Sequence, residues 1–98
     1  MAYKVSRKAA EDIANIYIEG VSGFGVAQAE KYHAEMEATF DLISSNPRIA
    51  RERQEIDPPV HIHPFGSHIV IYTVDAKNDV LIIRVRHGRE DWKHNPAE

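Results

Sequence analysis

The sequence predicts an α+β fold, in which a helical hairpin packs on one face of a small antiparallel sheet. Two segments between residues 7 and 45 carry apolar residues at helical spacing, and three apolar strand-like runs follow between residues 60 and 87. A short strand at residues 3–5 precedes the helices, and the sheet is expected to be mixed at that strand. The expected order is β-α-α-β-β-β, and the 98 residues are expected to form one domain, residues 1–98.

The first helix is predicted over residues 7–20, after Ser6, whose side chain can cap it. Glycines within residues 20–25 are expected to end it, and so short a link makes the next helix an antiparallel neighbour. That second helix is predicted over residues 26–45, ending at Asn46-Pro47. The inward positions are Ala10, Ile13, Ala14, Ile16 and Tyr17 in the first helix, and Ala29, Tyr32, His33, Met36, Phe40 and Ile43 in the second. The polar side chains expected to face outward from the first helix are Glu11, Asp12, Asn15 and Glu19.

Three strands are predicted at residues 60–63, 68–74 and 80–87. Pro64 has no backbone N–H to donate to a ladder, so its strand is expected at an edge of the sheet. The charged residues 48–55 are predicted to form a connector that could carry one more helical turn.

The strands at residues 69–74 and 80–83 are apolar at nearly every position, so both of their faces are apolar. Two helices can cover only one face of the sheet. The other face is expected to be covered either by Trp92 and the C-terminal tail or by a partner protein, since exposed apolar patches mark contact sites.

Composition narrows the functional classes. The net charge is −3; residues 1–47 hold four basic and seven acidic side chains, and residues 48–98 hold eight of each. Proteins that bind nucleic acid mainly through phosphates show a basic excess, which this chain lacks.

The sequence has no cysteines, so disulfides are excluded, and no apolar run reaches the roughly 18 residues of a membrane span. No signal peptide is recognised, and we expect a cytoplasmic protein without membrane contact.

The most informative segment is residues 84–92, Arg-Val-Arg-His-Gly-Arg-Glu-Asp-Trp, directly after an apolar strand. These residue types bind phosphate, transfer protons or anchor a partner. A strand that ends in such a cluster presents it at the margin of a sheet, where rigid structure supports functional sites.

This ending resembles the ParE branch of the RelE/ParE toxin superfamily, whose last strand commonly ends in a similar His-Gly-Arg-x-Asp phrase. The resemblance covers nearly the whole chain. Its other elements are Ala27-x-Ala29-Glu30-x-Tyr32 in the second helix, Asn46-Pro47 after it, and Phe65-Gly66-Ser67-His68 before the central strand. The members of this superfamily are toxins of bacterial type II toxin–antitoxin modules.

The resemblance implies a toxin neutralised by a small ParD-like antitoxin. The antitoxin's C-terminal segment wraps the toxin, and its N-terminal ribbon-helix-helix domain binds the operon's DNA, so the toxin meets that DNA only through the antitoxin. The ParE branch is associated with poisoning DNA gyrase. The RelE branch instead cleaves mRNA, commonly on the ribosome.

The two activities require different properties of residues 84–92. RNA cleavage by 2′-hydroxyl attack needs a general acid, a general base and cations around the phosphate. The proton carriers available are His87, His61, His63 and His68, and the cations are Arg84, Arg86, Arg51 and Arg53. RelE-type nucleases are clearly basic and often carry a tyrosine near the C-terminus, whereas this chain is acidic and its last aromatic residue is Trp92. We therefore favour a gyrase inhibitor without catalysis over an mRNA endoribonuclease. A non-toxic interaction module of the same fold is the third alternative.

The candidate target- or antitoxin-binding residues are Arg84, Arg86, His87, Arg89, Trp92, Ile69 and Ile71. If the chain is a ribonuclease, the catalytic residues would be His87, Arg84 and Arg86. Simpler roles remain open: Arg84 and Arg86 lie two apart, so they would share one face with Ile82 and pair in solvent with Glu90 or Asp91, and their loss would leave the fold intact. His61-x-His63 could bind metal with His68 or His87, but cysteine and a clear carboxylate ligand are lacking, so we expect no metal and no cofactor.

Overall fold

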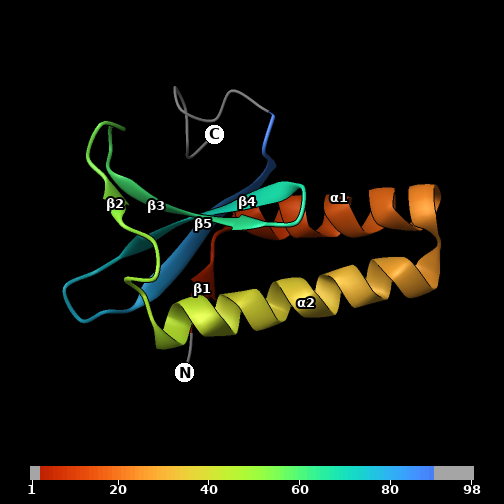
Figure 1. Ribbon diagram of the computed structural model, residues 1–98, viewed down its shortest axis with the longest axis horizontal. Coiled ribbons are helices and arrows are strands. Elements are labelled where there is room, and N and C mark those ends of the chain that lie inside the picture. The colour runs from red at the N-terminus through yellow and green to blue at the C-terminus, as the bar shows by residue number, and fades with distance from the viewer. Residues whose placement is uncertain (1–2, 90–98) are drawn as a thin grey trace.

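The computed structural model describes residues 3–89, in which a helical hairpin packs against one face of a five-stranded sheet (Figure 1). The strands lie in the order β1-β5-β4-β3-β2, with β1 parallel to β5 and every other pair antiparallel. The strand bounds are β1 Tyr3–Val5, β2 Glu52–Arg53, β3 Val60–Phe65, β4 His68–Val74 and β5 Val80–His87. The predicted α+β class, with a sheet mixed at its first strand, is confirmed.

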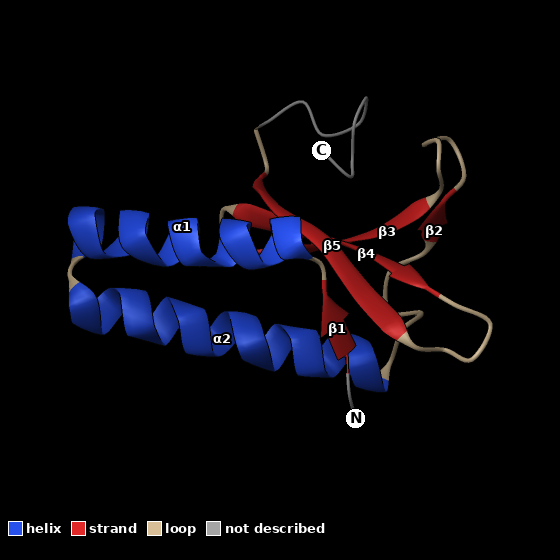
Figure 2. Ribbon diagram, turned by 180° about the vertical axis from the view of Figure 1, so that it is seen from behind, coloured by secondary structure: helices blue, strands red, loops and turns tan. Residues whose placement is uncertain are grey.

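Helix α1, Arg7–Phe24, begins at a residue that also belongs to the sheet. The Ser6 hydroxyl accepts a hydrogen bond from the backbone N–H of Ala9 at 3.0 Å, and it donates to the carbonyl of Ile83 at 2.8 Å. The Ser6 backbone N–H donates to the carbonyl of Ile82. One serine therefore caps the helix and ties its first turn to β5, which sets the position of α1 beside that strand (Figure 2).

The prediction that the first helix ends at residue 20 is wrong, because α1 continues through Gly20 and Gly23 to Phe24. A glycine inside a helix costs only about 1 kcal/mol relative to alanine, so tertiary packing can override it. At Gly20 the two helices approach closely: an added Cβ would lie 3.2 Å from the Cβ of Ala29. The chain reverses instead at Gly25, whose φ of +92° and ψ of 164° suit glycine almost exclusively.

Substitutions at two of these glycines should have opposite effects. Gly25→Ala is expected to lower the free energy of unfolding by about 1–3 kcal/mol, because alanine is strained in that backbone conformation. Gly23→Ala is the matched control: it is exposed within the helix, nothing lies near its added Cβ, and it should stabilise by about 0.5–1 kcal/mol. Urea denaturation of both variants checks the signs, and equal effects would contradict a chain reversal fixed by Gly25.

Helix α2, Val26–Ser45, runs antiparallel to α1, and the hairpin extends past the end of the sheet (Figures 1 and 2). Its predicted apolar stripe is largely confirmed, since Ala29, Met36, Phe40 and Ile43 are buried. No helix within residues 3–89 is long and apolar enough to cross a membrane.

The predicted strands are confirmed, with two corrections. Part of the connector forms β2, whose residues Glu52 and Arg53 pair with His61 and Val60 of β3. The strand that contains Pro64 is therefore not the outermost one in the sheet order, although β2 pairs only with its first half. Pro64 lies in the second half, where a missing backbone N–H is tolerated.

A bulge in β5 changes which side chains share a face. Tyr72 pairs with Ile82 and Ile71 pairs with Arg84, so Ile83 has no partner of its own in β4. The residues of β5 that reach the core beneath the helices are consequently Val80, Ile82 and Val85. Arg84 and Arg86 pair with Ile71 and Ile69, so the expectation that they share a face with Ile82 is wrong.

Each face of the sheet has its own apolar cluster. The larger one lies under the helices and includes Met36, Phe40, Val70, Tyr72 and Ile82. The smaller one occupies the opposite face and consists of Ile56, Val60, Ile62 and Ile71, of which none is more than 8% exposed. Ile56 comes from the segment between β2 and β3, so this chain itself supplies part of the cover. Trp92, the other expected cover, lies outside the described residues.

Candidate functional site

The terminal arginines do not form one cluster. Arg84 lies against α1, where its Nε donates to Oδ2 of Asp12 at 2.7 Å and its Nη2 donates to Oδ1 at 2.9 Å. The backbone N–H of Val85 donates to the same carboxylate at 3.0 Å. Both side chains are only 15% exposed. The expectation that Asp12 faces outward is therefore wrong, and Arg84 is held in a bidentate pair rather than presented to a ligand.

The Asp12 carboxylate provides the hydrogen-bond acceptor that a neighbouring strand would otherwise provide to β5. β1 pairs with residues 80–82, and within residues 3–89 no strand lies beside the edge of β5 beyond them. The Asp12 carboxylate satisfies the Val85 N–H there and neutralises Arg84 in the same step. Because the Arg84 side chain is mostly covered and paired with Asp12, we expect its removal to destabilise the fold.

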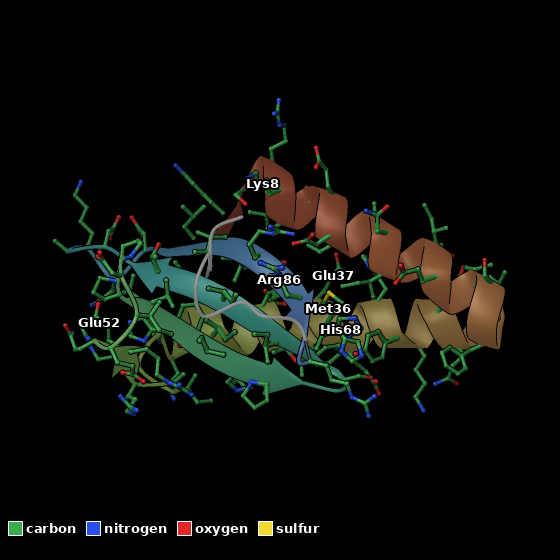
Figure 3. All side chains as sticks on the ribbon, turned by 90° about the horizontal axis from the view of Figure 1, so that it is seen from above. Lys8, Met36, Glu37, Glu52, His68 and Arg86 are labelled. Atoms are coloured by element: carbon green, nitrogen blue, oxygen red, sulfur yellow. The ribbon has the colours of Figure 1, made fainter. Side chains whose placement is uncertain are left out.

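The other predicted contact residues are spread over both faces of the sheet. Arg86 lies opposite Ile69, on the face away from the helices, and both residues are half-buried (Figure 3). Ile71 is fully buried, so it serves packing and offers no surface to a partner. Arg89 is exposed after the end of β5, and Trp92 lies outside the described residues.

The remaining candidates for phosphate binding lie at the far side of the sheet, near β2. Arg51 and Arg53 both come within 3.6 Å of the Glu55 carboxylate. His61 is buried, its Nδ1 lies 2.7 Å from the carbonyl oxygen of Ala50, and its ring stacks on Tyr72. These contacts make His61 a structural residue. His63, on the same strand, is half-buried, and its Nδ1 has no hydrogen-bond partner among residues 3–89.

Two histidines do come together at the end of the sheet nearest the hairpin. His68 begins β4 and His87 ends β5; they pair in register, and their ring centroids are 5.5 Å apart. The Tyr32 hydroxyl of α2 lies 2.7 Å from Nδ1 of His68 and 3.4 Å from the carbonyl of Phe65. Burial raises the pKa of the Tyr32 hydroxyl, so it keeps its proton at neutral pH. His87 accepts a hydrogen bond at Nδ1 from the Arg89 backbone N–H at 3.2 Å.

This pair lies at one end of a groove of about 500 Å³, which we call the hairpin groove. Its apolar walls are formed by Ile13, Ile16 and Phe24 of α1 and by Ala29 and Met36 of α2, and Figure 3 shows Met36 beside His68. Phe24 is 79% exposed, although it is the largest apolar side chain in the groove walls. An exposed apolar groove of this kind is typical of a site that binds an apolar segment of a partner.

The helical hairpin that forms the groove carries more acidic than basic side chains. Residues 7–45, which form the hairpin, contain three basic and seven acidic side chains. Glu19 lines the groove, while Glu37 lies beside His33 at 3.5 Å and Asp12 is engaged by Arg84. The groove is thus suited to an apolar segment that carries basic residues.

Across the part of the chain that the structure describes, no three potential metal-ligating side chains cluster.

Comparison with known proteins identifies the family. The model of the family described as "ParE toxin of type II toxin-antitoxin system, parDE" matches residues 3–92. The chain belongs to the ParE toxin family. Toxin ParE1 of Mycobacterium tuberculosis (strain CDC 1551 / Oshkosh) is 38% identical over 72 residues, 74% of each chain. Toxin ParE1 of Caulobacter vibrioides is 33% identical over 85 residues, which cover 87% of this chain and 86% of that toxin.

A solved structure supports the fold of this ParE-type toxin. A chain of the chromosomal ParDE toxin–antitoxin system from P. aeruginosa superposes with a TM-score of 0.75 and 21% identity. The match covers 89% of this chain and 95% of that one. The helical hairpin and the mixed sheet are therefore those of a ParE-type toxin of a type II toxin–antitoxin system.

Sequence reasoning missed three residues that shape the site. Asp12 gave no local signal, because its partner Arg84 is 72 residues away in the sequence. Phe24 did give a local signal. It lies between Gly23 and Gly25 at the turn between two helices, where an aromatic side chain is far from the core. Glu19 was expected at the surface, and it is exposed there, but its place on the groove follows only from the hairpin geometry.

Proposed function

We propose that this ParE-type toxin is neutralised by a ParD-like antitoxin whose C-terminal segment lies in the hairpin groove, and that it inhibits DNA gyrase by surface contact without catalysis. The groove is the observation that carries the antitoxin half of the proposal. It combines an apolar floor and apolar walls with the carboxylate of Glu19, and the exposed side chain of Phe24 lies at its edge. An amphipathic helix with aliphatic anchors on one face and basic residues at the margins has the complementary chemistry.

The distribution of the terminal cluster supports a toxin without catalytic chemistry. A phosphoryl-transfer site needs proton carriers and cations that converge on one phosphate. Here His87 lies beside the hairpin groove, Arg84 is bound by Asp12, and Arg86 lies on the opposite face of the sheet. The other paired arginines are near β2, at the opposite edge. This arrangement favours gyrase over mRNA as the target.

His87 separates the two mechanisms experimentally. In a nuclease, His87→Gln would remove a proton carrier, which typically costs about 10²–10⁴-fold in rate. For a contact inhibitor we expect less than about a tenfold loss of toxicity, because one neutral hydrogen bond is worth about 1 kcal/mol. The measurement is growth inhibition on induced expression, with mapping of mRNA ends in the same cells. Ribosome-dependent mRNA cuts by the parent chain, lost in a folded His87→Gln variant, would establish the endoribonuclease instead.

A further inference from the structure

The free end of the helical hairpin carries the most exposed large apolar side chains of residues 3–89. They are Phe24, which is 79% exposed, Ile18 at 60% and Val26 at 54%, and we call these three residues the hairpin tip. They lie in the last two turns of α1 and the first turn of α2, at the end of the hairpin that extends past the sheet (Figure 1). Phe24 also lines the hairpin groove, whereas Ile18 and Val26 do not. Exposed apolar side chains that gather in one place mark a contact surface.

The fold itself does not require large apolar residues at the hairpin tip. Between the two helices at this level, an added Cβ at Gly20 would lie 3.2 Å from the Cβ of Ala29, so small residues fill the space there. Ile18 and Val26 are β-branched, and such residues have a lower helix propensity than alanine. Because they are exposed, they also contribute little to the core, so smaller residues would serve the hairpin equally well. A partner that buries them would give them a role.

We propose that the hairpin tip is a second contact surface of this toxin, adjacent to the hairpin groove, and that it binds a basic surface of the target enzyme. The inference rests on the proposed function for the identity of that enzyme, DNA gyrase, and it goes beyond that function by assigning the surface that the toxin uses. Ile18 and Val26 are the anchors that the target alone contacts, while Phe24 belongs to both surfaces.

Charge complementarity favours such a target. Residues 15–35, which include the hairpin tip, contain three acidic side chains and one basic side chain, Lys31. The acidic side chains, Glu19, Glu30 and Glu35, are all exposed. An enzyme that binds DNA carries basic side chains where it contacts the phosphates. Apolar anchors with acidic neighbours therefore match a basic surface that has apolar recesses, and complementary charges also speed association.

The same charges disfavour other occupants of the hairpin tip. A second copy of this chain would bring like charges together, and anionic lipid headgroups would repel the acidic side chains. The antitoxin segment proposed for the hairpin groove would cover Phe24, but Ile18 and Val26 lie outside the groove lining. Because Phe24 is shared, that segment would occupy part of the surface that the target needs. Steric overlap then accounts for neutralisation of the toxin.

The variant Ile18→Ala/Val26→Ala removes the two anchors outside the groove. We expect the concentration of this chain that halves supercoiling by purified DNA gyrase to rise at least about tenfold, because a few anchors carry most of the affinity of an interface. Its dissociation constant for the ParD-like antitoxin, measured by titration calorimetry, should stay within about twofold of the parent value. Leu42→Ala, which truncates an exposed apolar residue far along α2 from the tip, is the matched control and should change neither quantity. Circular dichroism confirms that each variant is folded.

A charge variant tests the basic character of the target surface. Glu30→Gln/Glu35→Gln removes two exposed carboxylates that lie outside the groove lining. The half-inhibitory concentration should rise about threefold or more, because charges around an interface mainly set the rate of association. An unchanged or lower value would overturn the assignment of a basic surface.

An unchanged half-inhibitory concentration in the folded Ile18→Ala/Val26→Ala variant, or equal losses of gyrase inhibition and antitoxin affinity, would overturn the proposal. Sedimentation of the parent chain as a dimer that this variant does not form would also overturn it, because the tip would then bind a second copy. If the double variant does not fold, each single substitution is compared in the same way and should raise the half-inhibitory concentration about threefold. Absence of gyrase inhibition by the parent chain would reject the proposed function together with this inference, whereas inhibition that does not depend on the tip would reject the inference alone.

Discussion

Asp12→Ala is expected to lower the free energy of unfolding by about 3 kcal/mol, a large effect for the loss of one polar side chain. The change removes three hydrogen bonds together with the carboxylate that pairs with Arg84, whose side chain is only 15% exposed. Removing one member of a buried ion pair typically costs about 3–5 kcal/mol. Urea denaturation monitored by circular dichroism measures the loss.

The adjacent residue gives the matched control. Glu11 lies on the same turn of α1 and is exposed, so Glu11→Ala should change stability by no more than about 0.5 kcal/mol. A double-mutant cycle with Arg84→Ala should show that the two losses are not additive, because both remove the same interaction. Equal stability of Asp12→Ala and Glu11→Ala would show that the pair with Arg84 does not hold β5 against α1.

Phe24→Ala is expected to weaken binding of the ParD-like antitoxin by about 30-fold or more while the fold stays intact. Phe24 is 79% exposed, so its loss should hardly affect folding, yet it stands at the edge of the hairpin groove where an occupant would cover it. Truncation of a buried aromatic anchor at an interface costs about 2 kcal/mol or more. Titration calorimetry with the purified antitoxin provides the measurement.

Leu42→Ala tests whether the effect belongs to the groove. Leu42 is also an exposed apolar residue, at 47%, but it lies on α2 outside the groove lining. Its truncation should leave antitoxin affinity within about twofold of the parent value. If both substitutions weaken binding equally, or if neither does, the antitoxin segment does not lie in the hairpin groove.

The order of elements follows from local patterns. The apolar spacing of residues 26–45 predicted α2 and its buried residues, because a 3.6-residue period is a property of neighbouring positions. The same holds for β4 and β5, whose bounds were predicted as observed. Where the local signal was ambiguous, the prediction was wrong: Gly20 was taken as the end of a helix, but its role is a close approach to Ala29.

The geometry of the site could not be predicted from local patterns, because it depends on contacts between residues that are far apart in the sequence. The run Val80-Leu81-Ile82-Ile83 is apolar throughout, so nothing in it marks Ile83 as the bulged residue, and the faces of Arg84 and Arg86 were assigned incorrectly. The contact of Asp12 with Arg84 depends on where α1 lies beside β5. The convergence of His68 with His87 follows from strand register, which the sequence leaves open within a residue or two.

Supercoiling of relaxed plasmid by purified DNA gyrase, in the presence of increasing amounts of this chain at pH 7.5, tests the proposed function most directly. We expect dose-dependent inhibition, reversed by an equimolar ParD-like antitoxin, with mRNA left intact when the same preparation is incubated with ribosomes. Undiminished supercoiling at a large excess of folded chain, together with ribosome-dependent cleavage of mRNA, would contradict gyrase inhibition by surface contact.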